Sequence, residues 1–142
     1  MPSDRPLYVI ASPGLRAARS RWDRQIAELT ELLPDAKLIT FADLPDAFAA
    51  VPAERRTARL ARAYAGAIAI PDKIGRPYRR WLGPVAVAEA EAFIAAGKQV
   101  LVYAAGELAG WTACELRPDD RYPGSKLAEV LVPRFRAGVR AA

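Results

Sequence analysis

Two acidic residues, Asp72 and Glu89, are the first candidates for catalytic residues, because each lies close to a short apolar segment. The chain contains no histidine. The absence of histidine removes the Ser-His and Cys-His pairs of most nucleophilic hydrolases, and it removes most zinc sites. Any acid–base chemistry would therefore come from carboxylates, tyrosine, lysine or arginine. The chain also has no GxxxxGKS/T or GxGxxG pattern, so we expect neither a metal ion nor a cofactor.

Glu89 lies in a segment, residues 84–96, that predicts a helix with Gly97 as its C-cap. At about 100° per residue, Glu89 and Glu91 stand about 160° apart, so they would not act as a pair. Two interpretations follow. Either both glutamates are edge residues with basic partners, or Glu89 is a catalytic carboxylate oriented toward a ligand, near the strand end that carries Asp72. The helix is otherwise apolar on every side, which predicts a homo-oligomer, either a dimer or a tetramer, with this helix in the interface.

The loop after Asp72 concentrates positive charge and aromatic rings. The guanidinium group of arginine binds phosphate through two parallel hydrogen bonds, and aromatic rings stack on bases. This loop therefore suits a nucleotide, such as a 5′-monophosphate. The alternative is a solvated loop with Trp81 in the core. A second basic stripe, on residues 55–62, is typical of a solvated helix face, with a nucleic-acid backbone as the alternative partner. The loop residues that we predict to contact substrate are Lys73, Arg76, Tyr78, Arg79, Arg80 and Trp81.

Short apolar runs alternate with helical stripes along the chain. The alternation is typical of an α/β fold, so we expect one domain over residues 1–142, with a doubly wound parallel sheet of four or five strands and helices on both faces. Segment 104–142 is less regular, with "GWTACELRP" as a fifth strand and "KLAEVLVPRF" as a short helix interrupted at Pro133. The expected strands are 7–12, 36–41, 65–71 and 98–103, and the expected helices are 15–33, 52–64 and 84–96.

Ligands of such sheets bind beyond the carboxyl ends of the strands. This rule selects three segments: "ASPGLR", "FADLPD" and "PDKIGRPYRRWLGP". The first of them contributes Ser12, Pro13 and Gly14 as candidate contacts to a substrate. The third begins with Pro71 and Asp72 and contains the basic loop.

Composition limits the location and the partners of the protein. Its 142 residues carry a net charge of +5, which suits an anionic small molecule as well as nucleic acid. No apolar run approaches the roughly 20 residues that span a bilayer, so we expect no membrane association. Cys114 is the single cysteine, which argues for a reducing compartment and a cytoplasmic location.

"GAIAIPDK", a loop, and then "AEAEAFIAAGKQVLVY" resemble the core of the nucleoside 2-deoxyribosyltransferase superfamily, which has a flavodoxin-like, Rossmann-like α/β fold. Members of that family show a strand ending in aspartate, a loop with glycine, and a helix of the form E-x-x-x-A-x-x-x-G-K. Glu89 stands eight residues before Gly97, the spacing of the family's nucleophilic glutamate, and Asp72 matches its substrate-contacting aspartate. "YVIASPG", with Tyr8 and Pro13, is similar to the family's first strand and turn.

The resemblance implies cleavage or transfer at the N-glycosidic bond of a nucleoside or nucleotide. Glu89 would be the nucleophile, Asp72 would orient or protonate the base, and Tyr8 would hydrogen-bond a carboxylate or a sugar hydroxyl. Water as the acceptor gives hydrolysis, and a second base gives transfer. Two alternatives stay open: a nucleotide-binding or sensing module of the same fold without turnover, and a small basic protein associated with nucleic acid.

Overall fold

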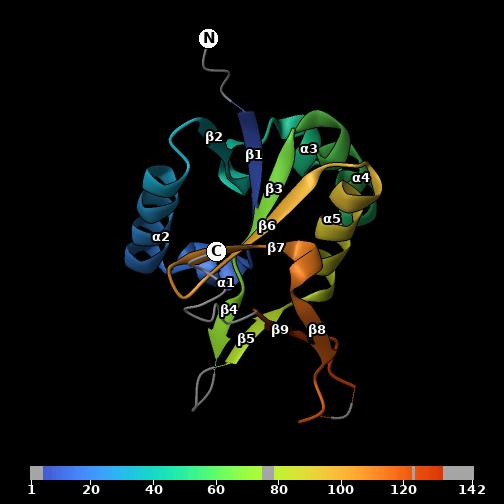
Figure 1. The fold of residues 1–142 in the computed structure, drawn as a ribbon. Helices are drawn as coiled ribbons and strands as arrows, with labels where there is room; N and C mark the ends of the chain where they lie inside the picture. Colours follow the sequence, from blue (N-terminus) through green and yellow to red (C-terminus); the bar gives the residue numbers. More distant parts are fainter. Residues whose placement is uncertain (1–4, 75–78, 123, 133–142) are drawn as a thin grey trace.

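The structure, a computed structural model, describes residues 5–74, 79–122 and 124–132. Its centre is a five-stranded sheet in the order β2-β1-β3-β6-β7 (Figure 1). The first four strands in this order run parallel, whereas β7 pairs with β6 antiparallel. The predicted α/β class is therefore confirmed, and the predicted parallel pairing holds for four of the five strands but not for β7. The strands are β1 (Arg5–Ile10), β2 (Ala36–Ile39), β3 (Gly66–Ala69), β6 (Gln99–Ala104) and β7 (Glu107–Gly110).

Helices cover both faces of this sheet, with α2 on one side and α4 and α5 on the other (Figure 1). The predicted helix over residues 15–33 is two helices, because Ala18 leaves the helical region at ψ 74° and separates α1 from α2. The C-cap of α5 is Ala96 and not the predicted Gly97, which follows directly with a φ of +76° and ends the helix. The helices are α1 (Pro13–Ala17), α2 (Arg19–Leu32), α3 (Asp46–Ala49), α4 (Ala53–Ala63) and α5 (Pro84–Ala95), with 3₁₀ turns η1 (Phe41–Asp43) and η2 (Trp111–Ala113).

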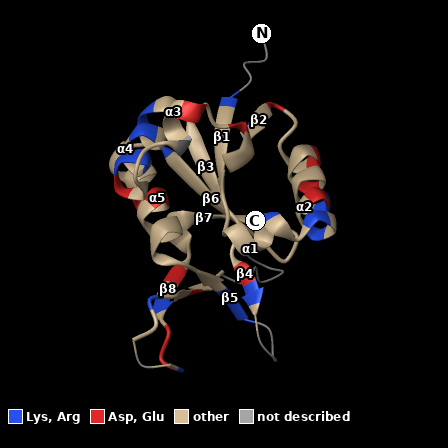
Figure 2. Cartoon of the chain, turned by 180° about the vertical axis from the view of Figure 1, so that it is seen from behind, with Lys and Arg blue, Asp and Glu red and all other residues tan. Residues whose placement is uncertain are grey.

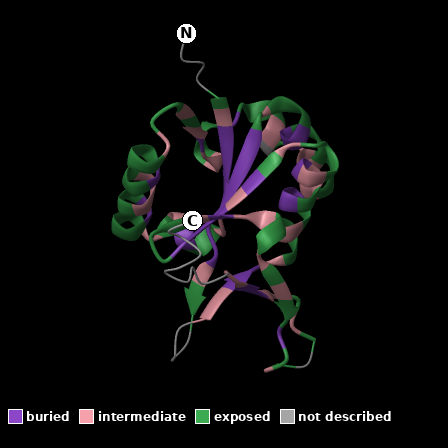
Figure 3. Ribbon diagram, in the orientation of Figure 1, coloured by how far each residue is buried: buried purple, intermediate pink, exposed green. Residues whose placement is uncertain are grey.

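Strand β1 shows how the core is divided between the two faces. Leu7 and Val9 belong to a cluster on the α2 side, whereas Tyr8 and Ile10 belong to a cluster on the side of α4 and α5. Successive side chains of a strand point to opposite faces, so one strand supplies both clusters. The central strands are buried along most of their length (Figure 3).

A second sheet, with all neighbours antiparallel, lies beyond the carboxyl end of β3 (Figure 1). Its order is β4-β5-β9-β8, and β4 begins three residues after β3 ends. Because ligands of α/β sheets bind at this end, the second sheet adjoins the place where a ligand is expected. The four strands are β4 (Asp72–Ile74), β5 (Arg79–Leu82), β8 (Glu115–Pro118) and β9 (Ala128–Leu131).

The second sheet corrects three predictions. Much of the basic segment after β3, predicted as a loop, forms β4 and β5. "GWTACELRP" is not one strand, because η2 separates Gly110, the end of β7, from Glu115, the start of β8. "KLAEVLVPRF" contains β9 instead of a helix, and Val130 of β9 is buried; a run this short does not distinguish helix from strand by its periodicity. Pro133 lies outside the described residues.

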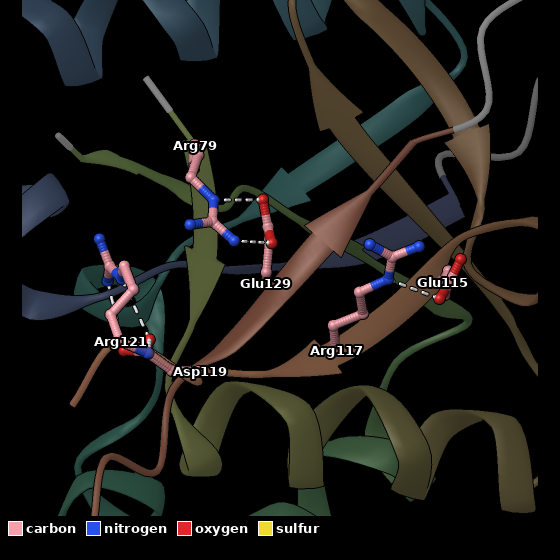
Figure 4. A network of polar contacts seen from close by, with 6 residues as sticks. All are labelled: Arg79, Glu115, Arg117, Asp119, Arg121 and Glu129. Carbon is pink, nitrogen blue, oxygen red and sulfur yellow. Dashed lines mark hydrogen bonds and ion pairs between the residues drawn. The ribbon is translucent and has the colours of Figure 1, made fainter. Parts of the chain in front are cut away.

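Ion pairs connect the strands of the second sheet and the turn after β8 (Figure 4). Arg79 of β5 donates two hydrogen bonds to the buried carboxylate of Glu129 on β9, and these bonds lower the pKa of Glu129. Arg121 donates to Asp119, and this bond is the largest contribution that lowers the pKa of Asp119 to about 2. The third pair, Arg117 with Glu115, is exposed, and pairs of that kind contribute little.

In the described part of the chain, no helix has the length and apolar character needed to cross a membrane. The outer side of α5 carries Val85, which is 47% exposed. The homo-oligomer that we expect from the apolar character of this helix stays a prediction.

Candidate functional site

A buried carboxyl group, that of Glu89, lies in the second turn of α5. Glu89 is only 6% exposed, and hydrogen bonds are not among the causes that shift the pKa of its carboxyl group. Burial raises the pKa of Glu89 from 4.5 to about 7, while the charges of Arg56 and Arg16 act in the opposite direction. A buried acid without a compensating hydrogen bond costs folding free energy. Glu89 is therefore a candidate for a ligand-binding or catalytic residue.

Glu89 shares its surroundings with Tyr8, Arg16 and Arg56, and the four side chains come from α5, β1, α1 and α4. Burial and then the negative charge of Glu89 raise the pKa of Tyr8, so its hydroxyl keeps its proton at neutral pH. The ring of Tyr8 stacks on that of Tyr64, with 6.2 Å between the ring centres. This packing fixes the phenol beside the acid.

The two arginines converge on one aromatic ring. The guanidinium carbon of Arg16 lies 4.4 Å from the centre of the Phe41 ring, and that of Arg56 lies 5.2 Å from it. The Nε atom of each arginine is buried and has no hydrogen-bond partner in the described part of the chain. Because Glu89 is only partly ionised at neutral pH, the two cations leave an excess of positive charge that suits an anionic ligand group.

Asp72 is joined to the same region through α1. Ser12 Oγ donates a 2.8 Å hydrogen bond to Asp72 Oδ1 and accepts one of 3.0 Å from the backbone N–H of Leu15. Ser12 is the N-cap of α1, and Arg16 lies in the last turn of that helix. Asp72 is not among the charges that shift the pKa of Glu89.

The stability of the protein should depend on pH through Glu89. The pKa is raised on folding, so between pH 4.5 and about 7 the unfolded chain loses this proton while the folded chain keeps it. Stability contributed by the protonated acid is present below pH 4.5 and is lost as the pH rises to about 7. At 1.36 kcal/mol per pKa unit the loss is about 3 kcal/mol.

Replacing Glu89 with glutamine removes this titration. We expect the free energy of unfolding of Glu89→Gln, relative to that of the wild type, to be about 3 kcal/mol higher at pH 8 than at pH 4. Urea unfolding at the two pH values measures this difference. Glu91→Gln, an exposed change on the same helix, should follow the wild-type profile. Parallel profiles for the wild type and Glu89→Gln would contradict the raised pKa.

The structure places four other predicted contact residues in two settings. Pro13 and Gly14 are exposed at the start of α1, directly after Ser12. Lys73 and Arg80 line a cavity together with residues of α2, on the face of the sheet opposite to Glu89.

The remaining residues of the basic segment belong to the second sheet or lie outside the described part of the chain. Arg79 is engaged by Glu129. Trp81 is fully buried, and its Nε1 atom has no hydrogen-bond partner in the part of the chain that the structure describes. Arg76 and Tyr78 are outside the described residues.

Arg16, Arg56 and Phe41 are site residues that we did not predict from the sequence. The sequence does hold a signal for two of them, because Arg16 ends "ASPGLR" and Phe41 opens "FADLPD", the segments that follow the first two strands. Arg56 was grouped with the solvated stripe of α4, yet it is half-buried while Arg55 and Arg59 are exposed. Figure 2 shows the basic residues of this helix.

Within residues 5–74, 79–122 and 124–132, no group of three or more His, Cys, Asp or Glu side chains is placed to hold a metal ion. The chemistry available to the site is thus that of a buried acid, a phenol and two cations. Comparison of the chain with protein-family models, curated proteins and solved structures found no match.

Proposed function

We propose that this protein cleaves or transfers at the N-glycosidic bond of a nucleotide, with Glu89 as the carboxylate at the anomeric carbon. The observation that carries the proposal is the buried side chain of Glu89, which has a raised pKa and lies among Tyr8, Arg16 and Arg56. The resemblance of the "AEAEAFIAAGK" helix to the nucleoside 2-deoxyribosyltransferase superfamily supports the same assignment.

The proposed chemistry uses the charge that develops in the reaction. Breaking the bond between C1′ and the base nitrogen builds positive charge on the sugar ring, which a nearby carboxylate stabilises and can capture. A carboxylate Oε of Glu89 forms a bond to C1′, and the electron pair of the C–N bond leaves with the base. The departing nitrogen takes a proton.

Water then completes the cycle. Its oxygen attacks C1′, the ester bond to Glu89 breaks, and the carboxylate is restored while the proton of the water is released. The products are a free base and a sugar phosphate; a second base in place of water gives transfer instead. Because the attacking group must be ionised, turnover should rise with pH through the pKa of Glu89, which is about 7.

Two further residues have supporting roles in the proposal. Asp72, oriented by its hydrogen bond from Ser12, contacts and orients the base, and water supplies the proton to the leaving nitrogen. Tyr8 keeps its proton and donates a hydrogen bond to Glu89 or to a sugar hydroxyl. Neither step needs a cofactor.

Arg16 and Arg56 give the proposal its preference for a phosphate group. A guanidinium group binds phosphate with charge-assisted hydrogen bonds, and both Nε atoms are buried without a partner in the described region. We expect Arg56→Gln to raise the KM for a nucleoside 5′-monophosphate at least about tenfold and to leave the KM for the matching nucleoside within about twofold.

The control for this prediction is the neighbouring residue. Arg55→Gln makes the same change of charge at an exposed position of the same helix and should leave both KM values unchanged. Release of free base from nucleosides and 5′-monophosphates, followed by chromatography, measures all three proteins. Equal effects of Arg55→Gln and Arg56→Gln would contradict a phosphate contact at Arg56.

A second candidate function is binding of a nucleotide without turnover. The same two arginines favour it, because they would hold the phosphate whether or not Glu89 reacts. In that case a nucleoside 5′-monophosphate raises the melting temperature while no free base is formed, and Arg56→Gln removes the shift. Formation of base that depends on Glu89 would exclude this candidate.

A further inference from the structure

A cavity of about 380 Å³ lies between α2, the start of the second sheet and the carboxyl end of β6. Lys73 and Arg80, which the sequence analysis assigned to a substrate, line it together with Arg21 and Arg24 of α2. Its walls also contain Tyr103, whose side chain belongs to the core cluster on the α2 side of the sheet. The cavity is thus on the opposite face of the sheet from Glu89, and its volume is in the range of small-molecule sites.

The charges around this cavity favour an anion. Four basic side chains line it, and Glu28 is the acidic residue among the lining residues. Glu28 accepts a hydrogen bond from the hydroxyl group of Tyr103, which holds the carboxylate in place. Burial, followed by that hydrogen bond, raises the pKa of Tyr103 to about 12. The phenol therefore stays protonated and the excess of positive charge persists at neutral pH.

Gln25 adds a polar group without a partner to the same wall. Its Oε1 atom is buried and has no hydrogen bond within the described residues, although the residue lines the cavity. An amide turned by 180° presents its NH₂ group instead, which donates two hydrogen bonds. A bound anion would satisfy this group.

A tight turn after β6 lines one side of the cavity. Ala105 and Gly106 line the cavity and have φ values of 55° and 75°. Positive φ at both central residues is typical of the two-residue hairpin turn that joins β6 to β7.

We propose that this cavity is a second ligand site, which binds a small molecule through one or two phosphate groups. Arg21, Arg24 and Arg80 hold the phosphate oxygens, and the amide of Gln25 donates to the same group. Arginine forks match phosphate oxygens in both charge and geometry. This site is separate from the Glu89 site and stands whether or not the proposed function is correct.

Inorganic pyrophosphate is the probe that tests the site, with binding measured by isothermal titration calorimetry at constant ionic strength. We expect Arg24→Gln to weaken pyrophosphate binding at least about fivefold. Glu28→Gln removes a nearby negative charge and should strengthen binding about two- to fivefold. These opposite signs are the expected signature of a cavity that contains both residues.

Matched variants on the same helix separate this site from general attraction to a basic protein. Arg19→Gln and Glu31→Gln make the same changes of charge at exposed positions of α2 that do not line the cavity, and both should bind as the wild type does. Arg56→Gln, on the other face of the sheet, removes the phosphate contact proposed at the Glu89 site and should leave the part of pyrophosphate binding that depends on Arg24 unchanged. The proposal is overturned if pyrophosphate does not bind, if Arg19→Gln weakens binding as much as Arg24→Gln does, or if Arg56→Gln removes all binding while Arg24→Gln has no effect.

Discussion

Glu89→Gln is expected to lower the release of free base from a nucleoside 5′-monophosphate by about 10³-fold or more, because the amide is a poor nucleophile and carries no charge. The neutral amide has nearly the size of the acid and avoids the cost of burying a charge, so the variant should fold. Its melting temperature at pH 8 should equal or exceed that of the wild type. A loss of activity without a loss of stability would identify a chemical role for Glu89.

Glu91→Gln is the matched control for this result. Glu91 lies two residues further along α5 and is exposed, whereas Glu89 is buried. We expect Glu91→Gln to retain turnover within about twofold of the wild type. Unchanged base release by Glu89→Gln would remove Glu89 from the mechanism.

Phe93→Ala is expected to lower the free energy of unfolding by about 3–5 kcal/mol. Phe93 is fully buried, lies one turn after Glu89 on α5 and packs in the cluster that contains Tyr8. Removing the ring leaves a cavity between α5 and the sheet, and the loss is large beside the total stability of about 5–15 kcal/mol that is usual for a domain. Chemical denaturation in urea measures it.

Val85→Ala is the control on the same helix. Val85 is 47% exposed, so its truncation should cost less than about 0.5 kcal/mol. The contrast shows that α5 is held by its sheet-facing side, which is also the side that buries Glu89. A cost below about 1 kcal/mol for Phe93→Ala would contradict this packing.

The sequence predicts the parallel part of the fold because each strand there is a local apolar run. "LYVI" and "QVLVY" each place side chains on both faces, and both faces are covered by helices. The second sheet was not predicted because its pairing is non-local. Trp81 pairs with Glu129 across 47 intervening residues, and no pattern within either segment indicates its partner.

The candidate site shows a similar division. The sequence predicts Asp72 as a site residue because it follows a strand end, and Glu89 because of its position in a helix. In the structure Glu89 is buried and Asp72 is half-buried. The sequence predicts that the basic partner of Glu89 comes from the loop after Asp72, where basic residues are concentrated. The structure instead brings Arg16 and Arg56 beside Glu89 from two helices that are distant in sequence. Charge density along a chain does not determine which face of a sheet a side chain reaches.

Capture of a covalent intermediate tests the central claim most directly. A nucleotide with fluorine at C2′ draws electrons from the sugar and slows breakdown of a glycosyl ester, so the sugar phosphate should remain on the protein. We predict a mass increase equal to that of the fluorinated sugar phosphate less one molecule of water, mapped by peptide mass spectrometry to Glu89 and absent from Glu89→Gln. Release of base without a label on any residue, or a label on another residue, would contradict the account.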